Sequence, residues 1–202
     1  MVVKSRAEMM AETRGKLIAA GRKAFALKGF AGASMDDLTA AVGLTRGALY
    51  HNFGNKHGLL AAIVAEIDGE MAARARVAGE KAKTPWQALE AQGVAYIELA
   101  LEPEIQRIVL LDGPAFLGDP SQWPSQNACL EETQAALSVL VETGMLKTVD
   151  IEAAARLLNG AALNAALWVA ASSDPKETLP KALAAFKCVM AGFLNPPKPH
   201  SG

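Results

Sequence analysis

The chain has 202 residues, a formal net charge of −1 and 51% hydrophobic residues, which is enough for a buried core and excludes wholesale disorder. Alanine supplies 40 residues, whereas valine and isoleucine together supply 19, and this composition favours helix over strand. Charge is uneven: residues 1–60 carry nine Lys or Arg against four Asp or Glu, and residues 61–202 carry eleven against seventeen. A basic segment on an acidic remainder suggests that the basic segment meets a polyanion.

Several classes of protein are disfavoured by what the sequence lacks. Cys129 and Cys188 belong to no CxxC or Cys/His cluster, so we expect reduced thiols, and the three histidines are too scattered to predict a metal site. Charged residues within the first eight positions argue against a signal peptide. The longest uncharged stretch, residues 157–173, contains two Asn and a Gly, which favours a buried helix over a membrane span. We therefore expect a cytoplasmic protein that uses neither a metal nor a cofactor.

In chain order, apolar residues recur at helical spacing in nearly every segment, which predicts an all-α fold. Predicted helices span about residues 9–28, 34–42, 46–52, 56–83, 86–101, 103–111, 125–143, 150–172 and 174–194. Their expected capping residues are Ser34, Thr45, Thr84, Asp150 and Asp174. Residues 112–125 are rich in Gly and Pro and predict a loop with a short helical piece.

The pattern of the helices predicts two domains. The helix over residues 56–83 turns polar beyond Gly69, as expected of a connector between a small N-terminal domain and a larger body. We therefore expect an N-terminal helical domain over residues 1–60, a larger helical domain over residues 61–194, and a flexible tail over residues 195–202, which contain three prolines.

The most informative stretch is residues 34–56, which predict a helix, a short turn and a second helix. Ser34, with an acid three residues later at Asp37, matches a capping pattern. Gly43 can adopt the left-handed conformation that a sharp turn requires. The second helix, capped by Thr45, is too short to be stable alone and must pack on its neighbours.

Leu49 and Phe53 are the expected inward anchors of this short helix. Its outward positions are small, polar or cationic, and they are Thr45, Arg46, Gly47, Ala48, Tyr50, His51 and Asn52. Such a surface can enter a DNA major groove, because the small residues permit close approach and the polar ones supply hydrogen bonds. The alternative is an ordinary helical hairpin with a solvated face.

Three segments of this region together resemble the DNA-binding domain of the TetR family of bacterial transcriptional regulators. They are residues 25–30 (FALKGF), 34–38 (SMDDL) and 41–60 (AVGLTRGALYHNFGNKHGLL). The resemblance covers roughly residues 10–60 and implies an N-terminal helix-turn-helix domain with a divergent helical body for ligand binding and dimerisation.

The resemblance also implies roles for single residues. Ser34, Tyr50 and Lys56 match positions that contact DNA phosphates, although Tyr50 can instead be read as a packing aromatic and Lys56 as a solvated charge. The remaining residues implied to lie at the groove or backbone are Thr45, Arg46, Gly47, Ala48, His51 and Asn52. Ala48 is often Ser or Thr in relatives, so a hydroxyl contact is missing here.

Two further sets of residues are predicted in the body. Aromatic and bulky aliphatic residues near the Gly/Pro-rich loop are together candidates to line a small-molecule pocket, although core packing is the simpler role for any one of them: Trp86, Tyr96, Leu111, Phe116, Trp123 and Leu137. Stripes on the last two helices predict a four-helix dimer interface, although they can instead face their own chain: Leu158, Ala162, Ala165, Val169, Leu183, Phe186 and Met190.

No arrangement of nucleophile, base and acid is recognisable, and the sequence contains no P-loop or GxGxxG, so we do not expect an enzyme. The sequence predicts a homodimeric repressor that binds a palindromic DNA operator and is released by a largely apolar small molecule. The alternative is a helical small-molecule-binding protein or enzyme in which the hairpin is only scaffold.

Overall fold

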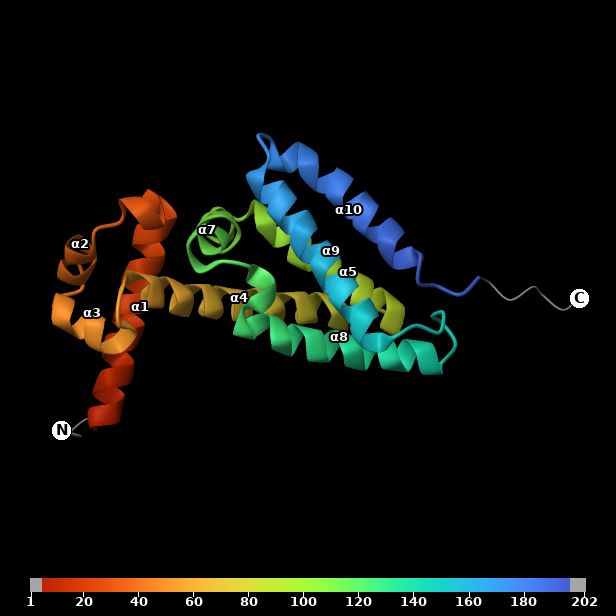
Figure 1. The fold of residues 1–202 in the computed structure, drawn as a ribbon, viewed down its shortest axis with the longest axis horizontal. Helices are drawn as coiled ribbons and strands as arrows, with labels where there is room; N and C mark the ends of the chain where they lie inside the picture. The colour runs from red at the N-terminus through yellow and green to blue at the C-terminus, as the bar shows by residue number, and fades with distance from the viewer. Residues whose placement is uncertain (1–4, 197–202) are drawn as a thin grey trace, which may run out of the picture. The chain divides into compact units, whose positions relative to one another are not determined.

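The computed structural model describes residues 5–196, and the predicted all-α fold is confirmed (Figure 1). Within this range no strand forms, although Leu146 and Leu194 make an isolated antiparallel bridge. None of the described helices is long and apolar enough to cross a membrane. The elements are α1 (Arg6–Gly32), α2 (Met35–Ala40), α3 (Arg46–Phe53), α4 (Lys56–Glu80), α5 (Pro85–Glu98), η1 (Leu99–Leu101), α6 (Pro103–Ile105), η2 (Gln106–Asp112), α7 (Gly113–Leu117), η3 (Pro120–Gln122), α8 (Pro124–Glu142), α9 (Ile151–Ala171) and α10 (Pro175–Ala191).

Local capping chemistry fixes where most of these helices begin. All five capping residues expected from the sequence accept a backbone N–H of the first turn through the side chain: Ser34, Thr45, Thr84, Asp150 and Asp174. The sequence did not reveal a sixth cap, at the start of α1. There the Ser5 hydroxyl accepts from the Glu8 N–H, and the Glu8 carboxylate accepts from the Ser5 N–H at 2.6 Å. The hydrogen bond from the Ser5 N–H, together with a contribution from the Ser5 hydroxyl to the same carboxylate, lowers the pKa of Glu8 below its usual range.

The described chain divides into two compact units. The first unit comprises residues up to Asp68 together with Glu102–Pro120, and the second comprises Gly69–Leu101 together with the residues from Ser121 onward. Residues 102–120 therefore fold with the N-terminal helices, although the sequence analysis assigned them to the body. The functional division at residue 60 remains a prediction.

In the first unit, α1 packs against α2, α3, α6 and η2. Its core is formed by fully or nearly fully buried side chains of α1 and α4 and of residues 102–120: Leu17, Phe25, Phe30, Leu59, Leu60, Ile63, Ile105, Ile108 and Val109. Gly29 bends α1 close to its end with φ +69°, a conformation that L side chains rarely adopt. A Cβ at Gly29 would also overlap the Arg107 guanidinium, so a larger residue would have to displace that flexible side chain as well as adopt the strained φ.

Residues 103–112 differ from the prediction. The expected single helix over residues 103–111 is a short α6 followed by the π-helical η2, whereas α7 is a short helical piece of the kind expected within residues 112–125. A π-helix keeps apolar periodicity close to that of an α-helix over so few residues, so the sequence pattern could not distinguish them. The wider turn places Ile108, Val109 and Leu110 in the core together with Asp112.

In the second unit, α9 packs against α5, α8 and α10 (Figure 1). Its buried face is built mostly of alanines, which permit close approach of the neighbouring helices. The end of α10 is fastened to the loop before α9: the Lys147 N–H donates to the Phe193 carbonyl at 2.9 Å, and the Asn195 amide donates to the carbonyls of Gly144 and Leu146. Asn195, expected in the flexible tail, is thus hydrogen-bonded, whereas residues 197–202 lie outside the described range.

Candidate nucleic-acid interface

The α2–turn–α3 segment is fixed by hydrogen bonds that its own sequence supplies. The Ser34 hydroxyl accepts from the Asp37 N–H at 3.3 Å, and the Thr45 hydroxyl accepts from the Ala48 N–H at 3.2 Å. Between these caps, Gly43 has φ +66° and the Leu44 N–H returns to the Thr39 carbonyl at 2.9 Å. The turn therefore has the geometry of a helix-turn-helix pair.

The short α3 is held in place from its inner face. Leu49 is fully buried, as predicted. Phe53 is half-buried, and the Arg14 guanidinium of α1 lies 4.6 Å above the centre of its ring. Tertiary contacts thus stabilise a helix that could not persist alone.

The outer face of α3 presents the residues that the sequence analysis placed there. Thr45, Arg46, Gly47, Tyr50 and His51 are exposed. Ala48 and Asn52 are half-buried, and the Asn52 amide N–H donates to the Ala48 carbonyl at 2.8 Å. That bond uses one donor of Asn52 within its own helix, so Asn52 has less freedom to contact a base than its position alone suggests.

Arg46 is held by two neighbours on the same surface. Its guanidinium donates to the Tyr50 hydroxyl at 3.2 Å and lies 3.5 Å from the Asp36 carboxylate of α2. The hydrogen bond with Tyr50 raises the pKa of Arg46 above its usual value, and the attraction of Asp36 contributes in the same direction. Since all three groups are exposed, these contacts orient the guanidinium and are weak enough to exchange for a nucleic-acid partner.

Lys56 lies at the start of α4, close to the end of α1. Its ammonium nitrogen is 4.6 Å above the centre of the Phe30 ring and 3.5 Å from the Ala31 carbonyl oxygen. Burial lowers the pKa of Lys56, and the attraction of Asp112 partly opposes that effect. Ser34, in the same unit, is half-buried and its hydroxyl keeps a proton to donate.

The sequence analysis did not identify the residues that support this surface. The buried Asp112 carboxylate accepts from the Phe30 N–H at 2.7 Å and from Arg107 at 3.3 Å, and thereby joins η2 to the end of α1. Phe30 also packs against His57 and Phe116, with ring centres 4.9 and 4.5 Å away. An aspartate within an apolar stretch was the only sequence signal for this contact.

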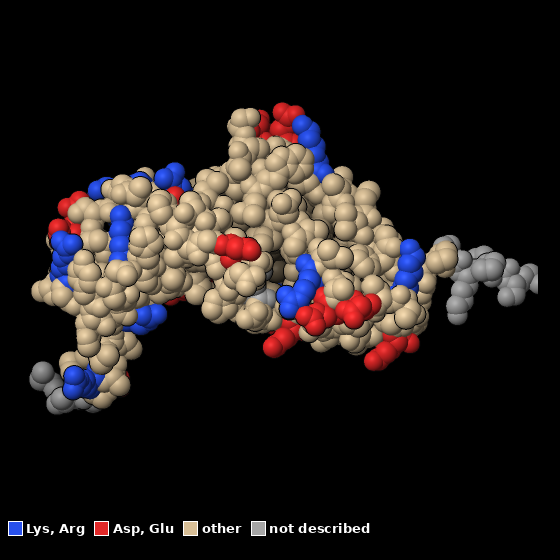
Figure 2. Space-filling view, in the orientation of Figure 1, with Lys and Arg blue, Asp and Glu red and all other residues tan. Residues whose placement is uncertain are grey.

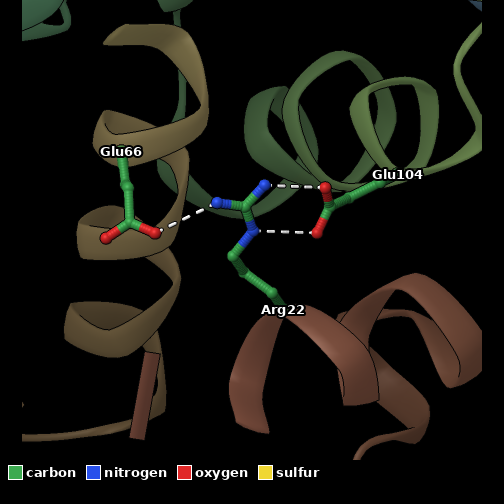
Figure 3. Close-up of polar contacts among 3 residues, drawn as sticks. All are labelled: Arg22, Glu66 and Glu104. Atoms are coloured by element: carbon green, nitrogen blue, oxygen red, sulfur yellow. Dashed lines mark hydrogen bonds and ion pairs between the residues drawn. The ribbon is translucent and has the colours of Figure 1, made fainter. Parts of the chain in front are cut away.

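A second support is centred on Arg22 of α1 (Figure 3). Its guanidinium donates to both carboxylate oxygens of Glu104, at 2.9 and 2.8 Å, and to Glu66 of α4 at 3.0 Å. The hydrogen bonds from Arg22 lower the pKa of Glu104, and burial partly opposes this. Figure 2 shows Lys and Arg side chains over the N-terminal helices, together with a few acidic groups.

The structure does not bring the six candidate pocket residues together. Tyr96 lines a cavity in the second unit, where Leu137 is fully buried and Trp86 and Trp123 are half-buried. Leu111 and Phe116 belong to the first unit, because residues 102–120 fold with the N-terminal helices. Ligand binding by any of these residues remains a prediction.

The candidate dimer residues lie mostly on the inner faces of α9 and α10. Ala165 and Leu183 are half-buried, and the other five are buried within the single chain: Leu158, Ala162, Val169, Phe186 and Met190. Buried side chains cannot supply exposed area to a second chain. The sequence pattern gave no means to choose between the two sides of α9, because its opposite face is also apolar, with Leu157 66% and Trp168 50% exposed.

The fold and this surface define a class, the helix-turn-helix transcriptional regulators. The model of bacterial regulatory proteins of the tetR family matches residues 17–63, and that of the tetracyclin repressor-like C-terminal domain matches residues 86–193. The chain belongs to the TetR family.

Known relatives resemble this chain over at least two thirds of its length. The crystal structure of a TetR-family transcriptional regulator from Pectobacterium atrosepticum is 45% identical, with a TM-score of 0.87, covering 96% of this chain and 100% of that one. The Transposon Tn10 TetC protein of Escherichia coli is 25% identical over 93% of each chain. The HTH-type transcriptional repressor AcnR of Corynebacterium glutamicum is 29% identical over 69% of this chain and 72% of its own. The first of these is named as a transcriptional regulator and the last as a transcriptional repressor.

Proposed function

We propose that this regulator is a ligand-responsive repressor that binds a near-palindromic operator as a homodimer. The observation that carries the proposal is the exposed face of α3, where Arg46, Gly47 and Tyr50 stand on a helix fixed by two capped ends and a buried Leu49. The Arg46 guanidinium and the Tyr50 hydroxyl can bind base edges and the adjacent phosphates. Gly47, which has no side chain, lets the helix approach the DNA closely.

Phosphate contacts would come from Tyr50 on this helix and from two groups beside it. Ser34, Tyr50 and Lys56 each carry a hydrogen-bond donor in the first unit. The contact with Arg46 limits the motion of the Tyr50 side chain, and the contact with the Phe30 ring limits that of Lys56. Donors held in place lose less conformational entropy when they bind a phosphate.

The second chain of the proposed dimer would cover the outer face of α9. Leu157 and Trp168 are eleven residues apart, which is three helical turns, so they lie on one side of the helix with Asn164 between them. Exposed apolar side chains of this size are favourable partners for a second copy of the same face in an isologous interface.

The dimer can be tested with matched substitutions. Trp168→Glu should convert the protein to monomer in sedimentation, whereas Val139→Glu, at a similarly exposed position on α8, should leave the dimer intact. A Trp168→Glu protein that remains dimeric would reject this face as the interface.

A small molecule in the second unit is proposed to weaken DNA binding. Two reading helices fit successive major grooves only near a spacing of about 34–36 Å or a multiple of it, so a ligand that changes their separation prevents simultaneous contact. Linkage requires DNA to weaken ligand binding by the same factor. The relative named as a repressor supports the assignment of repression over activation.

Selection of bound sequences from a random DNA pool tests the function directly. We expect two half-sites with inverted symmetry and a centre-to-centre spacing of about one helical turn or a multiple of it. Enrichment of no sequence, together with elution from heparin at low salt, would favour the alternative in which the hairpin is only scaffold.

A further inference from the structure

The second unit contains a cavity of about 100 Å³ among α4, α5, α8, α9 and α10. Its walls are largely apolar, with Leu89, Leu158, Phe186 and Met190 among them. An engineered apolar cavity of about 150 Å³ accommodates benzene, so this cavity has the scale of a single ring. Its size depends on Gly93, since a Cβ there would lie 2.5 Å from atoms of the Phe186 ring.

The charged residues of the lining neutralise each other. Arg76 of α4 donates to the Glu132 carboxylate of α8 at 2.7 Å, and both side chains are about half exposed. An ionised ligand would have to leave water and compete with this pair for a counter-charge. Burial of a charge without its own partner is strongly unfavourable, so the lining favours an uncharged ligand.

The polar part of the lining offers amide donors. The Thr133 hydroxyl donates to the Asn159 side-chain oxygen at 2.9 Å and also lies 2.9 Å from the Cys129 carbonyl oxygen. That hydrogen bond occupies one lone pair of the Asn159 oxygen, and the N–H₂ of the same amide carries two donors that it can offer to a ligand. Gln92 of α5 lines the same cavity with a second amide.

We propose that this cavity binds a small uncharged molecule, about one ring in size, whose carbonyl-type oxygen accepts a hydrogen bond from Asn159. This inference rests on the proposed function, in which a small molecule occupies the second unit, and it narrows that molecule to the neutral carbonyl compounds. The Thr133–Asn159 contact determines the orientation of the donor, and the Arg76–Glu132 pair selects against ionised analogues.

Four probes of similar size separate these contributions: benzamide, benzoate, benzylammonium and toluene. In calorimetric titrations of the full chain without DNA, benzamide should bind at least tenfold more tightly than either ion. Asn159→Leu should weaken benzamide about two- to tenfold, the usual range for one neutral hydrogen bond, and leave toluene unchanged. Glu132→Gln should free Arg76 and strengthen benzoate relative to benzamide.

Two glycine substitutions locate the site. Gly93→Ala should displace the Phe186 ring and weaken every uncharged probe, whereas Gly69→Ala, at a helical glycine of α4 with no atom within 4 Å of the new Cβ, should change none. Benzoate binding as tightly as benzamide, equal effects of Asn159→Leu on benzamide and toluene, or no binding of any uncharged probe would each overturn the proposal.

The outcome can be separated from that of the proposed function. If benzamide binds as expected and leaves DNA affinity unchanged, the ligand class stands and the proposed release by a ligand in this cavity fails. If benzoate releases DNA while benzamide does not bind, the ligand class is wrong and ligand-responsive repression stands.

Discussion

Substitution of Asp112 should loosen the end of α1, and hydrogen exchange at the backbone amide of Phe30 should detect this change. The Asp112 carboxylate is buried, and its Oδ2 accepts from the Phe30 N–H at 2.7 Å. Asp112→Ala leaves that N–H buried without a partner. Hydrogen bonds to charged groups contribute about 1.5–3 kcal/mol, and every 1.4 kcal/mol corresponds to a factor of ten. Hydrogen exchange at the Phe30 amide should therefore accelerate roughly 10- to 150-fold.

Native-state hydrogen exchange followed by NMR measures this rate. Asp112→Asn keeps an oxygen at the same place and loses only the charge, so its acceleration should be clearly smaller. Asp150→Ala is the matched control: it removes the cap of α9, whose Oδ1 accepts from the Ala153 N–H at 2.8 Å, and should leave the Phe30 amide unchanged. If the Phe30 amide exchanges at the same rate in Asp112→Ala as in the parent, the carboxylate does not hold the end of α1.

Three further results are expected. Lys56→Ala should weaken binding to all DNA sequences alike and reduce the slope of log K against log salt by about 1.8 in a dimer, since about 0.9 is lost per phosphate contact; an unchanged slope would assign Lys56 to packing on α1 alone. Arg46→Ala should lose about 1–3 kcal/mol of discrimination at one position of each half-site, measured by substituting every operator base; a uniform loss across sequences would indicate a phosphate contact instead. The lowered pKa of Glu104 means that its ionised form stabilises the folded state above about pH 4.3, its ordinary value, and that this contribution disappears as the pH falls through the lower folded-state pKa. Urea unfolding at several pH values should thus show Glu104→Gln less stable than the parent at pH 7, by about 1 kcal/mol or less because both partners are partly exposed, and equal to it in acid; a difference that persists at pH 2 would contradict this.

Local chemistry made much of the fold predictable. The caps at Thr45 and Asp150 and the glycine turn at Gly43 depend on neighbours within four residues, so the sequence pattern revealed them correctly. The attachment of residues 102–120 could not be found this way, because Phe30 and Asp112, like Arg22 and Glu104, meet across 82 positions of chain.

The two faces of α9 show a different limit. Large apolar residues occur on both sides of this helix, although its exposed side also carries Glu152, Arg156 and Asn164, so the spacing of apolar residues identifies a helix but does not by itself show which stripe faces the core. The predicted dimer stripe contains Leu158, and the exposed stripe contains its neighbour Leu157. A shift of one position along the helix is a rotation of about 100°, which moves the side chain from the core to the surface. Only the packing of α5, α8 and α10 decides between them.

The attachment of residues 102–120 to α1 has a consequence for engineering. A DNA-reading module cut from this chain at residue 60 would leave behind Ile105, Ile108 and Val109, which cover its core, and the partners of Phe30 and Arg22. Such a fragment would expose apolar surface and a buried amide to water. Chimeric sensors that exchange reading modules between regulators should therefore transplant two stretches together, the N-terminal helices and residues 102–120, because each buries apolar side chains and pairs polar groups of the other.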